Sequence, residues 1–373
     1  MKILHLTPTY APAIGGIETV VANLISESAR HGIQADVMHV APDLSDEDVQ
    51  TPDGHIVFRR RLWPNRFIGF FKGLKGIAEG YDLLHVHDPQ ISALTLNVIA
   101  SRLRLPVILS THGGFFHTGS RGFAKQLHWK IFAPVLLKRY DEVLASSLND
   151  AKIFSEIYPS IGLAANGVDV NRFEAIPLDR ERTERRWIYW GRLSVNKRLN
   201  YIVDLIYSLR RENARIKLTI AGPDFDNISE ELQSAVTAKD LSDQIEIRGK
   251  MSEAELEANA AANGIYVTAS AHEGFGLTII EAMAAGLVVV CTNIAPLNQF
   301  VRHGHNGFLL NYDGSEEDEA AIRDIAQLDA SSYAVMSDNA RVTAREYSWQ
   351  TAYIPFLESY KRLVEAERNT ADV

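Results

Sequence analysis

The sequence predicts an α/β protein of two doubly wound domains, each a mainly parallel sheet covered by helices on both faces. Three observations predict this fold. The chain has 373 residues, whereas a single hydrophobic core usually stops growing near about 250 residues. Short apolar strands alternate with amphipathic helices twice along the chain. Runs such as 107–109 and 288–290 are apolar without alternation, which is typical of parallel strands buried on both faces.

The first domain is expected over residues 1–170. Its first strand lies close to the N-terminus, where the apolar run contains His5 and is too short for a signal peptide. Four more strands follow, each ending at a turn. The five expected strands are 3–7, 35–40, 83–87, 107–110 and 143–145.

The second domain is expected over residues 187–347, after a polar and highly charged linker at 171–186. Its expected strands are 187–190, 216–220, 245–248, 264–268 and 288–291. After Tyr347 the pattern changes to one long amphipathic helix. Ser348 can cap this helix and Pro355 is expected to kink it. We expect residues 348–373 to cross back to the first domain.

Composition and charge exclude several classes of protein. The content of hydrophobic residues is 46% and that of charged residues is 23%, which is ordinary for a globular protein. No apolar run reaches the roughly 18 residues that span a membrane. The net charge of −9 argues against nucleic-acid binding. The single cysteine, Cys291, rules out an intramolecular disulfide and indicates a reducing cytoplasm, and its apolar neighbours predict a buried strand position.

The strongest motif is a glycine-containing loop between an expected strand and helix, with Glu273 before it and Glu281 after it. Glycines let backbone N–H groups approach an anion, and a helix N-terminus favours negative charge. The two carboxylates could be a glycosidase acid–base pair. Eight residues of helix would separate them by about 12 Å, however, which exceeds the roughly 5–9.5 Å of such pairs. They are better suited to accept hydrogen bonds from hydroxyls at two ends of a sugar nucleotide.

Three further segments follow strands and carry polar chemistry. Arg192 and Lys197 share one loop, where they could hold a diphosphate or form an ordinary charged surface. The glycine pair ending at Gly16 could approach a phosphate or form a plain turn. His112 is followed by two glycines at the carboxyl end of a strand, which favours a site role over a structural one. His85 and His87 end another strand but have no third metal ligand at a recognisable spacing, so polar contacts to an acceptor or a plain structural role are preferred.

Taken in order, these segments resemble the retaining glycosyltransferases of GT-B fold, in the large family with the E-x7-E spacing. The resemblance covers nearly the whole chain and includes the segments 166–169, 221–223 and 306–309. The segments 110–118 and 192–197 are most similar to α-mannosyltransferases of xanthan- and acetan-type exopolysaccharide assembly. The resemblance implies transfer of mannose from GDP-mannose to a cellobiosyl-diphosphate-polyprenol, in a bacterial cytoplasm. A UDP-sugar-dependent enzyme with a different acceptor remains the alternative.

The resemblance also implies residue roles at matching positions. Glu273 would bind hydroxyls of the donor sugar, Glu281 would bind the ribose, and His112 would lie near the transferred sugar. Retention without a required metal or other cofactor is implied, with the leaving diphosphate stabilised by cations and N–H groups. Arg198 departs from the family, since many relatives have glycine there. The diphosphate would contact Gly16, Arg192, Lys197, Gly274, Phe275, Gly276 and Leu277.

Three other functions fit the sequence less well. A dinucleotide dehydrogenase would need a G-x-G-x-x-G after the first strand and an acidic residue at the end of the second, and both are missing. A metal-dependent, single-domain glycosyltransferase would use a D-x-D motif such as Asp224 and Asp226. A non-catalytic protein that binds nucleotide sugars stays open, and detection of a glycosylated acceptor would distinguish it from an enzyme.

A basic and aromatic segment, 59–75, suggests contact with a membrane. Cationic side chains attract anionic lipid and aromatic ones lodge at the interface. The alternative is an amphipathic helix packed on its own domain with a solvated basic face. We expect this segment to place the enzyme on the inner face of the plasma membrane, near a lipid-linked acceptor, with 125–139 as a weaker second candidate. The residues expected to make this contact are Arg60, Trp63, Phe70, Phe71 and Lys72.

Overall fold

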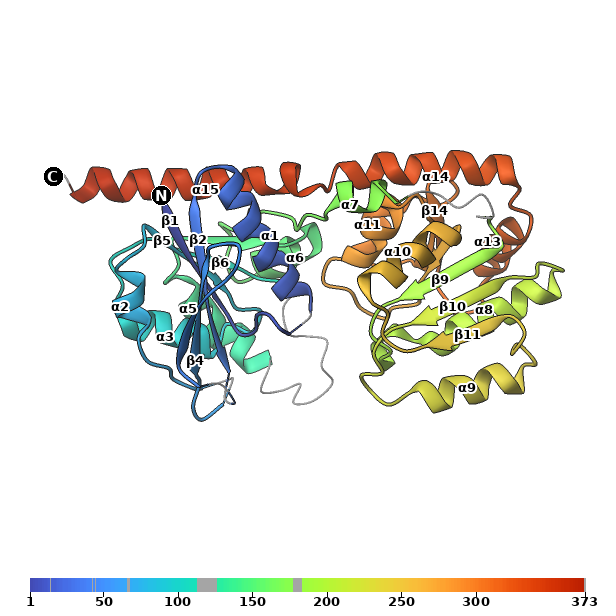
Figure 1. Cartoon of the computed structure of the whole chain (residues 1–373), viewed down its shortest axis with the longest axis horizontal. Coiled ribbons are helices and arrows are strands. Elements are labelled where there is room, and N and C mark those ends of the chain that lie inside the picture. The colour runs from blue at the N-terminus through green and yellow to red at the C-terminus, as the bar shows by residue number, and fades with distance from the viewer. Residues whose placement is uncertain are drawn as a thin grey trace. The chain divides into compact units, whose positions relative to one another are not determined.

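A computed structural model of the chain describes residues 1–13, 15–41, 43, 45–65, 68–112, 126–176 and 183–371. Within these residues the chain forms two compact units, drawn in Figure 1. Unit 1 comprises Met1–Gly167 and Trp349–Val373, and unit 2 comprises Val168–Ser348. Each unit is an α/β structure around a mainly parallel sheet, so the expected fold class is confirmed.

Unit 1 is built on an eight-stranded sheet in the described part of the chain, with the order β3-β4-β2-β1-β5-β6-β7-β8. Neighbouring strands are parallel except β3 and β4, which pair in antiparallel fashion. The strands are β1 (Lys2–Thr7), β2 (Gln34–Ala41), β3 (Glu47–Gln50), β4 (Ile56–Arg61), β5 (Leu83–His87), β6 (Val107–Ser110), β7 (Glu142–Ala145) and β8 (Gly162–Leu163).

Helices cover both faces of this sheet. The helices are α1 (Gly16–Arg30), α2 (Leu74–Ala78), α3 (Ala93–Ser101), the π-helix η1 (His128–Phe132), α5 (Ala133–Leu137), α6 (Leu148–Ser155) and α15 (Trp349–Ala371). Successive strand residues alternate between two cores because side chains of a strand point to opposite faces. Ile3 and Leu83 pack with α1 and α15, whereas Leu4 and Leu84 pack with α2, α3 and α5.

Unit 2 is built on a six-stranded parallel sheet in its described residues, with the order β11-β10-β9-β12-β13-β14. The strands are β9 (Arg186–Trp190), β10 (Lys217–Ala221), β11 (Ile245–Arg248), β12 (Ile265–Val267), β13 (Val288–Thr292) and β14 (Gly307–Leu310). The helices are α7 (Val170–Glu174), the 3₁₀ helix η2 (Val195–Lys197), α8 (Leu199–Arg211), α9 (Ser229–Ala238), α10 (Glu253–Ala262), α11 (Leu277–Ala284), α12 (Leu297–Phe300), α13 (Glu316–Ala326) and α14 (Ala330–Arg345).

The boundary between the units lies before the segment expected as a linker. The division falls between Gly167 and Val168. The first residues of the expected linker belong to α7, whose Val170 and Phe173 are buried within unit 2. Residues 177–182 of that segment lie outside the described residues. The last helix, α15, is part of unit 1 and carries Pro355 inside it.

Candidate functional site

The sheet of unit 2 reverses its strand order between β9 and β12. From β9 the chain adds β10 and β11 on one side, and then returns to add β12, β13 and β14 on the other. Ligands of open α/β sheets bind outside the carboxyl ends of the strands at such a reversal. The loops 191–198 and 268–276 follow β9 and β12 at this edge. They carry most of the residues that the sequence predicts for the donor site.

The loop after β9 presents two cations. Arg192 is exposed, and its Cζ lies 5.1 Å from the centre of the Phe225 ring, which orients the guanidinium by a cation–π contact. Lys197 closes the short helix η2 and is largely buried. Backbone hydrogen bonds to the loop after β10 fix this conformation. Leu193 N donates to Pro223 O at 2.9 Å, and Phe225 N donates to Leu193 O at 2.9 Å.

The D-x-D alternative fails because both carboxylates serve the backbone. Asp224 accepts from the N–H groups of Ile228 and Ser229, at 2.9 and 3.1 Å, where α9 begins. Asp226 accepts from Val195 N at 2.9 Å and so helps to hold the cationic loop. The division into two units also contradicts the single-domain fold that this alternative requires.

The loop after β12 ends in a helix N-terminus that depends on glycine. Gly276 has a left-handed conformation with φ of 98°. A Cβ at this position would lie 2.8 Å from Leu297 Cδ2, so any side chain would be strained. Helix α11 begins at the next residue, Leu277, and has no side-chain cap. Its first N–H groups are therefore available to a bound anion. Phe275 is buried against Phe300, with the ring centres 5.2 Å apart, so this residue offers its backbone and not its ring.

An ion pair joins the two loops. Lys197 Nζ contacts Glu273 Oε1, and both side chains are largely buried. Ser270 Oγ donates to the same carboxylate oxygen at 2.7 Å, and Ala271 N donates to Asn196 O at 2.8 Å. The structure thus brings together two residues that lie 76 positions apart in the sequence. Because the cation is already neutralised by Glu273, a bound diphosphate would have to exchange with this carboxylate or share the ammonium with it.

Arg198 adds a second connection between the same loops. Its backbone is left-handed, with φ of 45°, a conformation that glycine adopts without strain. Its guanidinium donates to Ala269 O at 2.7 Å and to Ser270 O at 3.3 Å. The side chain therefore fastens the cationic loop to the end of β12.

Glu281 lies inside α11 and is half-buried. Trp190 Nε1 donates to Glu281 Oε2 at 3.5 Å. Burial raises the pKa of this carboxyl above its ordinary value, although the bond from Trp190 and the charge of Arg172 oppose the shift. A carboxylate with few partners of its own is suited to accept hydrogen bonds from ligand hydroxyls.

Unit 1 has its own reversal of strand order, between β1 and β5. Gly16 is the first residue of α1, and a Cβ there would meet nothing within 4 Å, so this surface is open. The Glu18 carboxylate folds back toward the preceding Gly15. The negative charge of Glu18 therefore lies near the N-terminus of α1, and this side chain would have to move for a phosphate to bind there.

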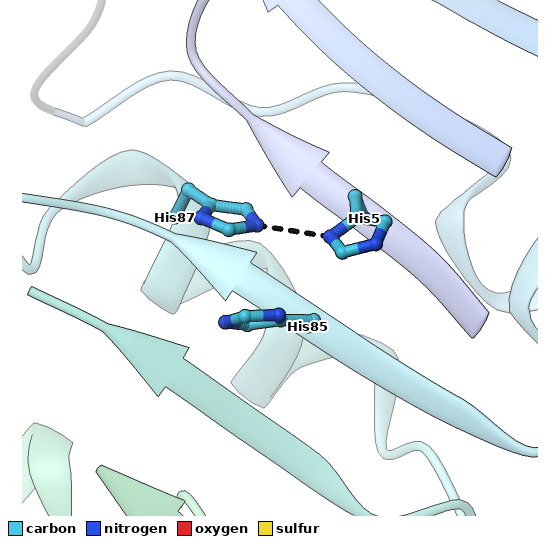
Figure 2. A group of neighbouring side chains, drawn as sticks. All are labelled: His5, His85 and His87. Carbon is cyan, nitrogen blue, oxygen red and sulfur yellow. Dashed lines mark hydrogen bonds between the residues drawn. The ribbon is translucent and has the colours of Figure 1, made fainter. Parts of the chain in front are cut away.

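His112 ends a line of buried histidines in unit 1. His87 Nδ1 lies 2.7 Å from His112 Nε2, and His87 Nε2 lies 3.0 Å from His5 Nδ1. Figure 2 shows the second of these bonds, with His85 beside it. Burial lowers the pKa of His112 to about 4 and that of His5 to about 3. It also lowers the pKa values of His85 and His87 well below the ordinary value. The four imidazoles are therefore neutral at pH 7.

Sequence reasoning missed His5, which is the third histidine of this cluster. The available signal was strand register, because β1 and β5 are parallel neighbours and His5 pairs with His85. One nitrogen from each of His5, His85 and His87 lies within 4.8 Å of the others, a spacing that a metal ion could use. Both ring nitrogens of His85 are already engaged, however, with Tyr360 OH and Ser110 Oγ at 2.8 Å each. The cluster is thus hydrogen-bonded internally.

Comparison with known proteins identifies the family. Residues 173–343 match the family model described as glycosyl transferases group 1, and residues 14–172 match glycosyltransferase family 4. The chain is 30% identical, over 98% of its length and 94% of the relative's, to a GDP-mannose:cellobiosyl-diphosphopolyprenol alpha-mannosyltransferase of Komagataeibacter xylinus. The chain belongs to the group 1 glycosyltransferases.

A further relative and two solved structures are also similar to this glycosyltransferase. A protein of the same name from Xanthomonas campestris is 26% identical over 96% of both chains. Among solved structures, sucrose-phosphate synthase from Thermosynechococcus elongatus superposes with a TM-score of 0.77 at 18% identity, over 98% of this chain and 100% of that one. Anabaena HepE, in complex with UDP and glucose, has a TM-score of 0.74 at 20% identity, over 97% and 100%. These two likenesses show the GT-B fold.

The basic and aromatic segment of the glycosyltransferase divides into exposed and buried residues. Trp63 is 70% exposed and Phe70 is 57% exposed, and their backbones pair with each other in antiparallel fashion. Lys72 is exposed as well. Two expected contact residues are not available at this surface. Phe71 is buried in the core of unit 1, and Arg60 forms an ion pair with Asp48 at 2.6 Å.

The fold of this segment explains both differences. Residues 59–61 belong to β4, where the strand pairing with β3 brings Arg60 close to Asp48. Phe71 N donates to Asn97 Oδ1 at 3.2 Å, which directs the chain inward against α3. The described residues of this segment up to residue 73 are therefore a strand and an aromatic loop, and only Leu74 and Lys75 are helical, as the start of α2. The amphipathic helix considered as an alternative is thus wrong for most of the described residues of the segment.

Proposed function

We propose that this glycosyltransferase transfers mannose from GDP-mannose, with retention, to a lipid-diphosphate-linked oligosaccharide in exopolysaccharide synthesis. The observation that carries the proposal is the likeness, over at least 96% of the chain, to relatives named as GDP-mannose:cellobiosyl-diphosphopolyprenol alpha-mannosyltransferases. A described site with cations, a free helix N-terminus and two carboxylates supports the same chemistry.

The donor would lie across the ends of β9 and β12. Arg192 and Lys197 would hold the diphosphate by charge-assisted bonds, together with the N–H groups of residues 274–277. In unit 1, the N-terminus of α1 at Gly16 would offer N–H groups to a phosphate in the same way. The donors of unit 2 would stabilise the charge that develops on the leaving diphosphate, so no metal would be required. Glu281 would accept the ribose hydroxyls. Glu273, released from Lys197, would accept hydroxyls of the sugar. In unit 1, His112 would offer its imidazole to a sugar hydroxyl.

The second candidate is a UDP-sugar-dependent enzyme, because HepE, which shares the fold, is described in complex with UDP and glucose. A thermal-shift comparison of GDP and UDP separates the two. A nucleotide present at 100 times its dissociation constant stabilises a protein by about 2.7 kcal/mol. We expect stabilisation by GDP and a much smaller effect of UDP at the same concentration.

Transfer itself is tested with GDP-mannose and a cellobiosyl-diphosphate-polyprenol in detergent. Mass spectrometry should detect an acceptor that is one hexose heavier, and the new glycosidic bond should be sensitive to α-mannosidase. Release of GDP without a heavier acceptor would contradict the proposal. A heavier acceptor formed only from a UDP-sugar would favour the second candidate.

A lipid-linked acceptor implies that the enzyme contacts a membrane. Among the described residues, no helix has the length and apolar character needed to cross a bilayer. Exposed apolar side chains gather at two places on unit 1. One is the aromatic loop, defined here by Trp63, Ile68 and Phe70. The other is the apolar helix face, defined here by Ile131, Phe132 and Val135 of η1 and α5. We infer peripheral contact with the inner face of the plasma membrane through these side chains, supported by nearby lysines.

A further inference from the structure

Three histidines of unit 1 form one continuous line of hydrogen bonds. His5 comes from β1, His87 from β5 and His112 from the residues after β6, three strands that are neighbours in the sheet. His5 and His87 are fully buried, and His112 is half-buried. The outer end of the line is His112 Nδ1. The inner end is His5 Nε2, which has no hydrogen-bond partner among the described residues.

Neutral imidazoles leave two arrangements of protons in such a line. Each ring carries one N–H, and each bond needs one proton between its two nitrogens. If His87 donates from Nδ1, then His5 donates from Nδ1 and His112 carries its proton on Nδ1. If His87 donates from Nε2, then His112 donates from Nε2 and His5 carries a proton on its buried, unpartnered Nε2.

The buried end selects between the two arrangements. Orphaned N–H groups are rarer in protein interiors than unpaired acceptors, because an unpaired buried donor is costly. In the first arrangement the unpartnered His5 Nε2 is a bare acceptor. In the second it would be an orphaned donor. The first arrangement is therefore favoured, and it turns the N–H of His112 outward on Nδ1.

We propose that His87 is a positioning residue that fixes His112 as the neutral tautomer with its proton on Nδ1. His112 then presents a hydrogen-bond donor, which suits a hydroxyl oxygen of a bound sugar, and it cannot accept a proton at the nitrogen held by His87. The backbone of His112 is left-handed, with φ of 50°. The catalytic consequence rests on the proposed function, whereas the tautomer itself does not.

Neutrality of the line is supported by its surroundings. Burial lowers the pKa values of all three rings. The ring of His85 lies beside the line and is tilted against its neighbours, with its centre 4.2 Å from that of His87 and 5.2 Å from that of His5. Its own nitrogens are held by Tyr360 and Ser110, so it does not compete for the nitrogens of the line.

The direct test is nitrogen NMR of protein labelled with ¹⁵N-histidine, in the absence of donor and acceptor. Long-range correlation spectra distinguish protonated from bare ring nitrogens, and the His112→Gln variant assigns the signals of His112. The Nε2–H form prevails for free imidazoles in water, so the expected Nδ1–H form is distinctive. A His112 with its proton on Nε2, or with a mixture of both forms, would overturn the proposal.

Two phenylalanine variants test the role of His87. His87→Phe removes the partner of His112 Nε2, so we expect His112 to shift toward the Nε2–H form. His5→Phe is the matched control, because it replaces a neighbouring buried histidine with the same side chain. In this variant the buried acceptor without a partner is His87 Nε2 instead of His5 Nε2. His112 should therefore keep its proton on Nδ1. Loss of the Nδ1–H form in both variants, or in neither, contradicts the assignment.

Two further measurements distinguish a positioning role of His87 from a metal site and from a purely structural role. One equivalent of Zn²⁺ should leave the signals of His5, His85 and His87 unchanged, whereas saturable shifts that vanish in His5→Phe would make the cluster a metal site and overturn the proposal. With GDP-mannose and acceptor, His87→Phe should lower kcat about tenfold, the effect of losing one hydrogen bond, and leave GDP affinity unchanged. If no transfer occurs with any donor, the proposed function fails but the tautomer result stands. An unchanged kcat with an altered tautomer removes the positioning role.

Discussion

At the scale of single residues, the two cations of the described donor site differ in their partners. Lys197 is neutralised by Glu273, while Arg192 rests on Phe225 and forms no ion pair within the described part of the chain. Arg192 can therefore bind a phosphate without breaking an ion pair, whereas Lys197 must break or share its ion pair with Glu273. The two cations should thus contribute differently to nucleotide affinity, although both lie on one loop.

The first prediction compares these cations. Arg192→Ala should weaken GDP binding by about 1.5–3 kcal/mol, the value of a charge-assisted bond. Lys197→Ala should weaken GDP binding less. The variant loses the cation, but GDP no longer has to compete with Glu273 for it. Isothermal titration with GDP measures both. Lys217→Ala, at the opposite end of β10 from the site, serves as the control and should leave affinity unchanged. Equal affinity of parent and Arg192→Ala would refute the role of this loop.

The second prediction concerns Glu281, whose pKa is raised by burial. A raised pKa in the folded state means that the ionised carboxylate costs stability above that pKa, and the cost disappears as the pH falls below the unfolded value. Glu281→Gln should therefore make the free protein more stable at pH 7 and yet weaken GDP binding, since an amide accepts ribose hydroxyls less well. Urea unfolding and GDP titration of the same variant test both signs.

The same carboxyl should make nucleotide binding depend on pH. As the pH falls through the raised pKa, Glu281 becomes protonated and GDP affinity should fall by up to about tenfold per pH unit. The Glu281→Gln variant should lack this component and so reports the titration of GDP itself. Parallel pH profiles for the two proteins would rule out a contact between Glu281 and the nucleotide.

The sequence was sufficient to single out Lys197 and Glu273, because each lies in a polar loop after an apolar strand. Their pairing could not be predicted, since it depends on β9 and β12 being neighbours in the sheet. The burial of Phe71 was equally hidden. Its neighbours Phe70 and Lys72 are exposed, whereas the backbone N–H of Phe71 donates to Asn97 of α3 and its ring packs in the core of unit 1.

At the scale of elements, helix α11 depends on the conformation of Gly276. The third prediction is that Gly276→Ala lowers the free energy of unfolding by about 1–2 kcal/mol, the cost of a left-handed alanine, and also weakens GDP binding. Gly249→Ala is the matched control, because a Cβ there meets nothing within 4 Å and its φ is not positive. Chemical unfolding with and without GDP measures both effects. A stable variant with normal affinity would show that the N-terminus of α11 does not bind the nucleotide.

The fourth prediction concerns the aromatic loop. The double variant Trp63→Ser, Phe70→Ser should bind vesicles of anionic lipid much more weakly than the parent, because it removes two exposed aromatic side chains from the interface. Val335→Ser, which changes a 60% exposed residue of α14, is the control. Co-sedimentation measures binding, and GDP titration confirms that unit 2 is intact. Undiminished vesicle binding would exclude the aromatic loop and leave the apolar helix face as the candidate.

Ten strands were predicted, and all ten are present with ends that differ by no more than about two residues. Most of them are strands buried on both faces, whereas β11 is an edge strand with exposed Glu246 and Arg248. The strands that were missed lack this signal for physical reasons. β3 is the edge strand and β4 lies next to it, and together they carry Glu47, Asp48 and three arginines, so their sequence resembles a charged surface segment. β8 has only two residues, and β14 begins with glycine.

At the scale of the whole molecule, the fold class follows from alternation and length, whereas the assignment of α15 to unit 1 depends on tertiary contacts. The fifth prediction concerns the stability of the protein at acidic pH. Burial lowers the pKa values of His5, His39, His85, His87 and His112. Lowered values mean that the unfolded state binds more protons below about pH 6.5, so stability present at pH 7 is lost as the pH falls.

Each such imidazole contributes up to about 1.4 kcal/mol per pH unit to this loss. Urea unfolding at several values between pH 7.5 and 5 should therefore show a steep fall in the free energy of unfolding of unit 1, monitored through Trp129. His39→Phe should make the slope shallower by about one proton. A slope that does not change in this variant would mean that His39 is charged or exposed in the folded protein.

The place of α15 in unit 1 also has a consequence for synthesis. Tyr360 bonds to His85, 275 positions earlier, and Tyr353 bonds to Ser28, 325 positions earlier. Trp349, Phe356 and Val364 complete the core that α1 and the sheet begin. A ribosome must therefore translate all of unit 2 before the first unit can close. Synthesis of unit 1 begins before that of unit 2, but one apolar face of its sheet stays uncovered until α15 has left the exit tunnel of the ribosome.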